Sequence, residues 1–330
     1  MSHLLKSLEI GPLSLKNRLV MPPMATAKAE PDGSVNQSIF DYYSEKSDGG
    51  YISLIIVEHS FISHEGQASE YQVSIADDQK IDGLEKLAEI IQNNGSKAVM
   101  QINHAGSAAP EDIIGTKPVG PSAVPNPRKG NTPHELTEKE IQDIVEAFSN
   151  AARRTKEAGF DGVEIHSAHG YLLNQFYSPL TNKRTDKYGG DVHKRIRIHL
   201  EVIEAVKKEV GEDFPILLRL GASDYQEGGT TIEDSKIAAR EFEKAGVDIL
   251  DISGGHSGYM VNGLDGQGFF APLTEAIKEV VSIPVILTGG ITEPEAAEKL
   301  LIEGKADLIG VGRAILEDST WAKRAIESLQ

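Results

Sequence analysis

The sequence contains no cysteine, and this absence removes several kinds of site at once. Disulfide bonds, cysteine-ligated zinc and iron–sulfur clusters all need cysteine sulfur, so none of them can form within these 330 residues. Basic residues are also in deficit, since 33 Lys and Arg stand against 50 Asp and Glu and give a formal net charge of -17. A charge of this sign disfavours nucleic acid and anionic membranes as partners.

Long hydrophobic runs are missing as well. The N-terminal residues have no apolar stretch of signal-peptide length, and no later run reaches the roughly 18 apolar residues that a transmembrane helix needs. With 39% hydrophobic and 25% charged residues, the composition is that of an ordinary globular protein with a sizeable core. We therefore expect a cytoplasmic protein that forms a single domain over residues 1–330.

The apolar segments alternate in type along the whole chain. Short runs of branched residues, typical of buried strands, are each followed by a segment of helical periodicity that commonly ends at glycine. The strand-like runs are residues 19–21, 53–57, 98–102, 163–165, 216–220, 249–252, 285–287 and 308–311. Eight strand-then-helix units predict an α/β fold of the (β/α)8 TIM-barrel type. A doubly wound open sheet is the alternative, and the lack of a G-x-G-x-x-G after the first strand counts against it.

Two segments depart from this alternation. Residues 4–15 are two extended pieces around Gly11-Pro12, which predicts an N-terminal hairpin that caps another part of the fold and stays out of the main sheet. Residues 107–133 follow the third strand and are rich in Gly, Pro and Ser. Because irregular loops of this length are usually lids or binding elements, we expect this lid insertion to cover the barrel mouth.

Proton-handling side chains are concentrated directly after the fourth strand. His166, His169 and Tyr171 form an H-x-x-H-x-Y pattern. Two imidazoles can polarise a carbonyl oxygen or hold an anion, and a phenol with a pKa of about 10 can protonate a basic carbon. A zinc site is the alternative, but the glutamate of an H-E-x-x-H motif is absent and there is no cysteine to act as a third ligand.

Further polar and glycine residues follow the other strands, and in such a barrel the carboxyl ends of the strands form the active-site face. Glycines after the seventh and eighth strands leave backbone N–H groups free for a phosphate, and Arg313 adds charge there. Arg219 needs a charge partner or a polar ring, and Gln101 offers a donor and an acceptor to an imide-like edge. These features predict a pocket for a phosphorylated planar heterocycle such as FMN.

Several longer motifs resemble the Old Yellow Enzyme family of NAD(P)H:flavin oxidoreductases. They are NRLVMPPM at 17–24, HAG at 104–106, GPSA at 120–123, HSAHGYLLNQFYSPLTNKRTDKYGGD at 166–191, and the GGI and GVGR endings of the last two strands. The resemblance spans essentially the whole chain and implies FMN as cofactor with NADH or NADPH as reductant. In length the chain resembles the short single-domain members. It does not resemble the long members, whose additional iron–sulfur and nucleotide domains require residues that it lacks.

The resemblance also implies a role for each candidate residue. Pro23, Met24 and Ala25 would lie along the flavin, His59 would offer its backbone, Gln101 and Arg219 would bind the pyrimidine edge, and Gly289, Gly290, Gly312 and Arg313 would bind the phosphate. His166 and His169 would hold the carbonyl oxygen of the substrate, and Tyr171 would supply a proton. The implied reaction is reduction of the activated C=C bond of an α,β-unsaturated carbonyl compound, with hydride from flavin N5.

Some positions depart from the family pattern. Ala25 stands where many relatives have Thr or Cys, a side chain that contacts the flavin, so the sequence does not predict the flavin's redox potential. Some short relatives share an active site between subunits through a tyrosine near position 27 and a C-terminal extension. Because this sequence has Ala27 and ends at Gln330, we expect no shared site of that kind, although a homo-oligomer is compatible with the sequence. The residues available to meet the 2′-phosphate of NADPH are Lys117, Arg128 and Lys129.

Two other functions stay open on the sequence. The first is an NAD(P)H:flavin oxidoreductase or oxidase without physiological ene-reductase activity. The second is a barrel lyase or isomerase acting on a phosphorylated substrate, for which Glu58 is the only acidic residue that we find at a strand end.

Overall fold

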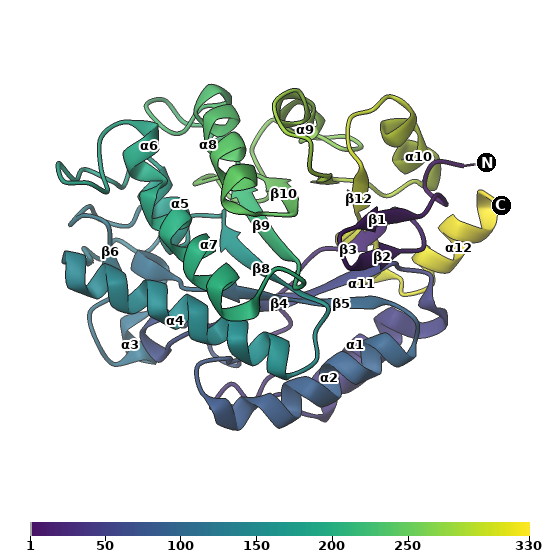
Figure 1. The fold of residues 1–330 in the computed structure, drawn as a ribbon, viewed down its shortest axis with the longest axis horizontal. Coiled ribbons are helices and arrows are strands. Elements are labelled where there is room, and N and C mark those ends of the chain that lie inside the picture. Colours follow the sequence, from purple (N-terminus) through teal and green to yellow (C-terminus); the bar gives the residue numbers. More distant parts are fainter. Residues whose placement is uncertain (1) are drawn as a thin grey trace.

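The computed structural model describes residues 2–330, and its centre is a closed barrel of parallel strands with helices outside it (Figure 1). The barrel closes because the last strand pairs with the first, through Ile309 and Leu19. In barrel order the strands are β3 (Leu19–Met21), β4 (Leu54–Phe61), β5 (Lys97–Asn103), β8 (Gly162–Ser167), β9 (Ile216–Gly221), β10 (Ile249–Ser253), β11 (Val285–Thr288) and β12 (Leu308–Gly310). The predicted (β/α)8 fold is confirmed.

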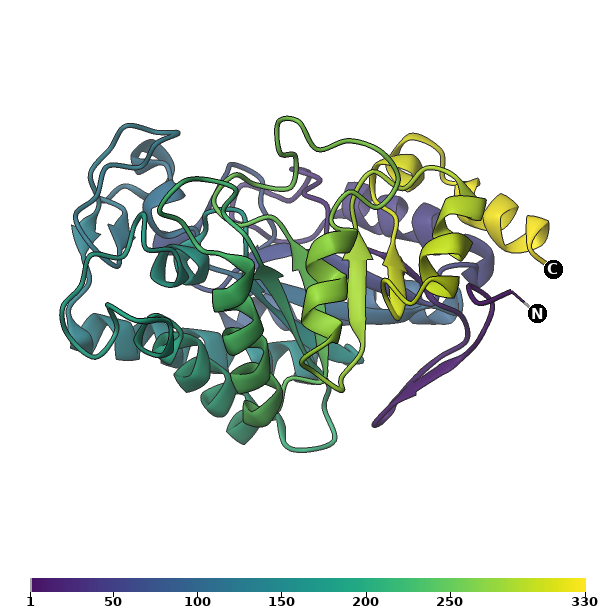
Figure 2. The ribbon, with the colours of Figure 1, turned by 90° about the horizontal axis from the view of Figure 1, so that it is seen from above.

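The helices pack on the outer face of the barrel (Figures 1 and 2). They are α1 (Gln37–Ser47), α2 (Ile81–Asn93), α4 (Glu138–Glu157), α5 (Leu172–Tyr177), α6 (Val192–Arg195), α7 (Arg197–Val210), α8 (Ile232–Ala245), α9 (Ala271–Lys278), α10 (Pro294–Ile302), α11 (Arg313–Glu317) and α12 (Trp321–Ser328). Helix α4 starts at a capping box between Thr137 and Glu140 and buries Ile141, Ile144 and Phe148. None of the helices formed by residues 2–330 is long and apolar enough to cross a membrane.

The helical periodicity of about residues 191–210 predicts a single helix, and this prediction is wrong. The segment forms α6 and α7 with a break at Ile196. The buried guanidinium of Arg195 donates to the carbonyl oxygens of Tyr177 and Gly190, at 2.8 Å and 2.7 Å. These bonds tie the first turn to the preceding loop, an interaction that helical periodicity does not reveal.

The N-terminal hairpin closes one end of the barrel. Strands β1 (Leu8–Ile10) and β2 (Leu13–Leu15) pair antiparallel, as expected, outside the main sheet. Ile10, Leu13 and Leu15 are buried in one cluster with interior residues from the amino ends of the barrel strands. In Figure 2 the purple hairpin lies at the lower right and the loop after β10 at the top, on opposite sides of the barrel.

The barrel interior changes from apolar to polar toward that open end. Alternate strand residues face inward, and the layer next to the hairpin is apolar. Its members are Val20, Leu54, Ile56, Val99, Leu217, Ile249, Ile286 and Leu308. Two residues further along their strands stand Gln101, Arg219 and Asp251, all buried, and β8 contributes the buried Glu164 beside Gln101. The core therefore ends where a polar layer begins, directly below the mouth.

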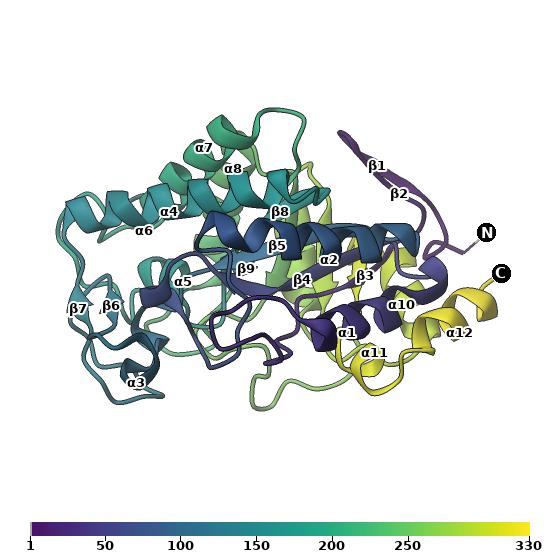
Figure 3. The same ribbon diagram turned by 90° about the horizontal axis from the view of Figure 1, so that it is seen from below.

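The insertion after β5 has regular structure of its own. It contains a 3-10 turn at Gly106–Ala108, the short helix α3 (Glu111–Ile114) and the paired strands β6 (Val119–Gly120) and β7 (His134–Glu135). Figure 3 shows α3, β6 and β7 together at one side of the barrel. The sequence had indicated an irregular loop, because two-residue strands carry no readable period.

Candidate active site

The fourth barrel strand ends in a sharp turn that presents three reactive side chains. His166 lies within β8, and His169 and Gly170 have φ of 61° and 77°, so the chain reverses before α5 begins after Tyr171. A left-handed conformation costs a residue other than glycine about 1 kcal/mol, and such strain is concentrated at functional sites. The turn therefore imposes on His169 a backbone conformation that histidine does not favour by itself.

The rings at this turn form one aromatic cluster. The ring centroid of His166 is 5.2 Å from that of His169 and 5.1 Å from that of Tyr171. His59, from β4, stacks on Tyr171 at 5.6 Å, and Tyr259, from the loop after β10, meets His169 at 5.7 Å. The structure thus brings together four of the predicted site residues, and it adds Tyr259.

Burial keeps this cluster uncharged. Burial, with the neighbouring His169 and Arg219 charges, lowers the pKa of His166 well below its usual value, and burial and Arg219 do the same for the pKa of His169. Burial first, and then Arg219, lowers the pKa of His59 to about 4, whereas burial raises the pKa of Tyr171. At neutral pH the imidazoles are neutral and the phenol keeps its proton.

The two histidines of the turn differ in their hydrogen bonds. His169 Nε2 lies 2.8 Å from the hydroxyl of Ser253, the last residue of β10. His166 Nδ1 is buried and forms no hydrogen bond with any residue from 2 to 330. Within residues 2–330, no group of three or more His, Asp or Glu side chains is placed to hold a metal ion.

Below the histidines, the polar layer contains the two side chains predicted to bind a pyrimidine edge. Arg219 Nε lies 3.2 Å from Asp251 Oδ2, which supplies the charge partner that the sequence required. Gln101 Nε2 donates to Glu164 Oε1 at 2.7 Å. Neither carboxyl group was predicted from the sequence, although each is a lone charge in an apolar strand, two residues before His166 or Ser253.

The first strand leads into the segment predicted to lie along the flavin. Pro23 and Met24 are half-buried and Ala25 is exposed. Glu58, in the middle of β4, accepts hydrogen bonds from Thr26 N at 2.9 Å and Thr26 Oγ1 at 2.7 Å. Glu58 therefore holds this segment in place, and burial raises its pKa to about 7.

The last two strands meet the first at the predicted phosphate corner. A Cβ on Gly312 would lie 3.2 Å from Met24 Sδ, and one on Gly290 would lie 2.4 Å from the carbonyl oxygen of Gly266. The backbone N–H groups of Gly290 and Gly312 donate no hydrogen bond to any residue from 2 to 330. Gly289 packs against Phe269, and the exposed Arg313 has Nη1 3.9 Å from Met260 Sδ.

The lid is fastened to the rest of the barrel by basic residues. Arg128 Nη2 donates to the carbonyl oxygen of His256 at 2.9 Å, which links the lid to the loop after β10. Arg184 Nη1 donates to the carbonyl oxygen of Pro121 at 2.9 Å, and Lys183 N to Ser122 Oγ at 3.0 Å. The second half of the long central motif therefore supports the lid.

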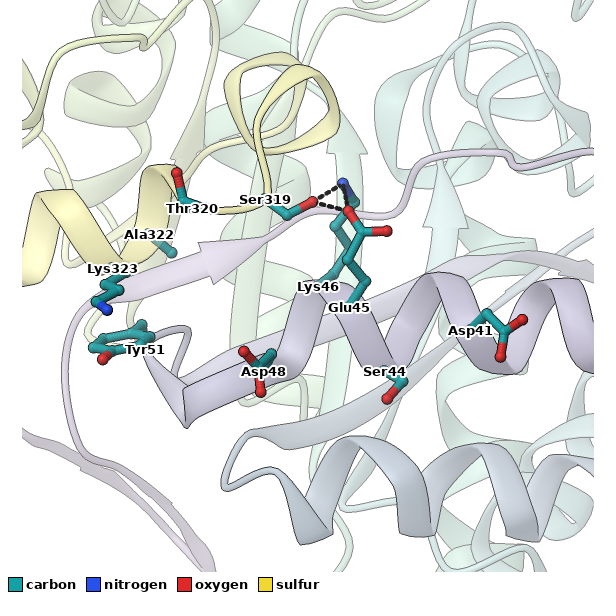
Figure 4. A pocket seen from close by; sticks show the side chains of 10 residues that line it. All are labelled: Asp41, Ser44, Glu45, Lys46, Asp48, Tyr51, Ser319, Thr320, Ala322 and Lys323. Atoms are coloured by element: carbon teal, nitrogen blue, oxygen red, sulfur yellow. Dashed lines mark hydrogen bonds and ion pairs between the residues drawn. The ribbon is translucent and has the colours of Figure 1, made fainter.

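A separate groove of about 450 Å³ lies outside the mouth, between α1 and the start of α12 (Figure 4). In its wall, Lys46 is buried and its Nζ donates to Ile315 O at 3.0 Å and to Ser319 Oγ at 2.5 Å. These contacts hold the carboxyl end of α11, the helix that begins at Arg313. The residues of this groove can therefore affect the predicted phosphate corner by fixing the position of α11.

A family model for the NADH:flavin oxidoreductase / NADH oxidase family matches residues 3–330. The chain belongs to this family. NADH oxidase of Thermoanaerobacter brockii is 46% identical over 97% of the chain, and NADPH dehydrogenase of Listeria monocytogenes serotype 4a (strain HCC23) is 38% identical over all of it. The chain spans about half the length of the first of these relatives, 50%, and 96% of the second.

Solved structures place this family member among the Old Yellow Enzyme barrels. The chain of a 2-naphthoyl-CoA reductase complex superposes with a TM-score of 0.94 at 29% identity, over 99% of this chain and 52% of that one. The old yellow enzyme homologue from Zymomonas mobilis superposes with a TM-score of 0.84 at 28% identity, over 99% of this chain and 93% of that one. FMN is the cofactor of this flavin oxidoreductase family, with NADH or NADPH as reductant.

The residues present in this family member fit FMN. Among residues 2–330, Arg219 Nε has no hydrogen-bond partner, and the Gln101 amide keeps one N–H and its carbonyl oxygen free after its bond to Glu164. The unused N–H groups of Gly290 and Gly312 can receive phosphate oxygens. Donors for both ends of the cofactor therefore lie around the mouth of the barrel.

Proposed function

We propose that this chain is an FMN-dependent NAD(P)H oxidoreductase that reduces the activated C=C bond of α,β-unsaturated carbonyl compounds. The observation that carries the proposal is the neutral cluster at the carboxyl end of β8, in which the ring of His166 lies 5.2 Å from that of His169 and 5.1 Å from that of Tyr171. Gln101, Arg219, Gly290 and Gly312 would hold FMN at this mouth, and the flavin would supply the hydride chemistry between the nicotinamide and the β-carbon of the substrate.

The side chains of the cluster divide the remaining work. Neutral His166 and His169 each have one N–H to donate, and two such donors to a carbonyl oxygen make the conjugated β-carbon electrophilic. Tyr171 then protonates the α-carbon, since its raised pKa keeps the hydroxyl protonated at neutral pH. His59, stacked on Tyr171, holds the phenol ring in position.

A second candidate function is reduction of flavin or oxygen without a physiological alkene substrate. It is favoured by the 46% identical relative, which is named an NADH oxidase. A lyase or isomerase acting on a phosphorylated substrate is less well supported, because its candidate base, Glu58, is already bound to the Thr26 amide and hydroxyl.

The test is an absorption spectrum of the purified protein, followed by anaerobic reduction with NADH or NADPH and reoxidation by a panel of enones. We expect a bound yellow flavin that enones reoxidise faster than oxygen does. Tyr171→Phe should bind flavin and accept hydride normally but slow reoxidation by enones about 10²- to 10⁴-fold, the usual contribution of a general acid. The exposed Tyr71→Phe serves as control. A colourless protein that gains no flavin, or enone reoxidation unchanged in Tyr171→Phe, would contradict the proposal.

A further inference from the structure

Beneath the histidines, the barrel interior holds two carboxyl groups that the proposed reaction does not use. Glu164 on β8 and Asp251 on β10 are both 0% exposed. They stand behind the two side chains assigned to the flavin, because Glu164 accepts from Gln101 at 2.7 Å and Asp251 lies 3.2 Å from Arg219. Each of the two side chains assigned to the flavin is therefore supported by a buried carboxyl group.

The charges of this layer do not balance if both acids are ionised. Two carboxylates and one guanidinium would leave a net negative charge in the interior, which is costly. Glu164 Oε2 and both carboxyl oxygens of Asp251 have no hydrogen-bond partner among residues 2–330, so no donors stabilise a second negative charge. Burial and the Asp251 charge hold the pKa of Glu164 well above its usual value, and burial raises the pKa of Asp251 only to about 6.

We propose that Glu164 and Asp251 are positioning residues that hold one proton between them, with Glu164 neutral and Asp251 acting as the counter-ion of Arg219. This inference rests on the proposed function, since Gln101 and Arg219 are the side chains that hold the flavin there. A neutral Glu164 still accepts from Gln101 and fixes the amide, so the other N–H and the carbonyl oxygen face the ligand. Arg219 then meets one negative charge and not two, and its guanidinium keeps its attraction for an electron-rich ring edge.

Infrared spectroscopy tests the proton without flavin turnover or substrate. The wild-type protein at pH 9, where the Glu58 carboxyl with its pKa of about 7 is ionised, should show the C=O stretch of a buried carboxylic acid that is lost in Glu164→Gln. The band should shift when glutamate carries a ¹³C carboxyl group and stay in place when aspartate does. Glu204→Gln, on the exposed face of α7, is the matched control and should keep the band. A spectrum without the band, or a band that follows the aspartate label, overturns the proposal.

Urea denaturation distinguishes one negative charge shared by Glu164 and Asp251 from two independent charges. In urea denaturation, Glu164→Gln and Asp251→Asn should each move the midpoint by about 0.5 M or less, because the remaining acid pairs with Arg219. The double variant leaves that guanidinium unpaired and should lose more than the sum of the single shifts. Additive shifts contradict a shared charge.

The positioning role is read from FMN affinity. Glu164→Gln keeps an acceptor for Gln101 and should bind FMN within about threefold of the wild type, whereas Glu164→Leu removes the acceptor and should weaken binding about tenfold. Equal affinities for the two variants overturn the role. If the wild-type protein binds no FMN, the proposed function fails, and the infrared and urea results still decide whether the pair holds a proton.

Discussion

At the scale of single residues, Ser253 decides which nitrogen His169 offers to a ligand. The Ser253 hydroxyl faces Nε2 at 2.8 Å, so Nδ1 is the nitrogen left for a carbonyl oxygen, and it carries the proton when the hydroxyl donates to Nε2. We expect Ser253→Ala to raise the KM for enones about three- to tenfold, because a lost hydrogen bond is worth about 0.5–1.5 kcal/mol. Ser253→Thr should restore it. Steady-state kinetics with both variants decide this, and an unchanged KM in Ser253→Ala would show that the tautomer is fixed in another way.

The residues that touch the mouth could be found from the sequence, whereas those that hold them could not. His166, His169 and Tyr171 belong to one local pattern, and a single turn brings them together. Ser253 and Arg128 act through partners 84 and 128 residues away in the chain, and no local pattern reports such contacts. Only strand register, known once the barrel is built, aligns Glu164 with Gln101.

At the scale of elements, the position of α11 depends on one buried lysine (Figure 4). Lys46 donates to the last carbonyls of this helix, at 3.0 Å and 3.4 Å, and Arg313 stands at its other end. Lys46→Met should lower the free energy of unfolding by about 2 kcal/mol, since hydrogen bonds from charged donors contribute about 1.5–3 kcal/mol. It should also weaken FMN binding several-fold. Urea denaturation and fluorescence titration measure both effects.

The control for this prediction lies in the same groove. Lys323 lines it as well, but its side chain is 53% exposed and it lies 4.0 Å from Glu327. Lys323→Met should change neither stability nor flavin affinity by a measurable amount. If both variants behave alike, Lys46 does not position α11.

The lid and the loop after β10 are joined by Arg128, which uses one of its several N–H donors on the carbonyl oxygen of His256. The Arg128 charge also acts on His169 and Tyr171 at the mouth, so we expect it to attract the 2′-phosphate of NADPH. We expect Arg128→Ala to slow flavin reduction by NADPH about tenfold more than reduction by NADH. Lys129→Ala is the neighbouring control. Equal losses with both nicotinamides would mean that Arg128 acts only as a link between the two loops.

The alternation of strands and helices was readable because each unit buries one face, and burial imposes a period on the sequence. The break between α6 and α7 and the short strands of the lid were not, because they depend on single contacts such as Arg195 with Tyr177. Long periodic elements are therefore predictable from their own residues, whereas short ones need the fold around them.

At the scale of the whole molecule, buried histidines make the stability depend on pH. Burial lowers the pKa of His104 and of His199 to about 3, and burial with the Arg219 charge lowers that of His59 to about 4. As the pH falls below about 6.5, histidines of the unfolded chain bind protons while these three stay neutral in the fold, so protonation favours unfolding. Glu58 acts in the opposite sense. Its pKa of about 7 lets the folded state bind a proton first, and stability gains between about pH 7 and pH 4.5.

His166 and His169, whose pKa values burial also lowers, add to these three histidines, and the five outweigh the three carboxyls with raised pKa values, Glu58, Glu164 and Asp251. The free energy of unfolding should therefore fall as the pH is lowered from about 6 to 4, by up to about 1.4 kcal/mol per pH unit for each uncompensated proton. His199 lends itself to a test because it lies on the outer face of the barrel, where it contacts Ser167 at 2.7 Å and stacks on Phe242. In His199→Gln the slope should decrease by about one proton, whereas the exposed His193→Gln should leave it unchanged. Urea denaturation of the three proteins between pH 8 and pH 4 measures these slopes. Identical slopes in all three would show that His199 is protonated in the folded state, and the neutral, desolvated interior described for this barrel would then be wrong on its outer face.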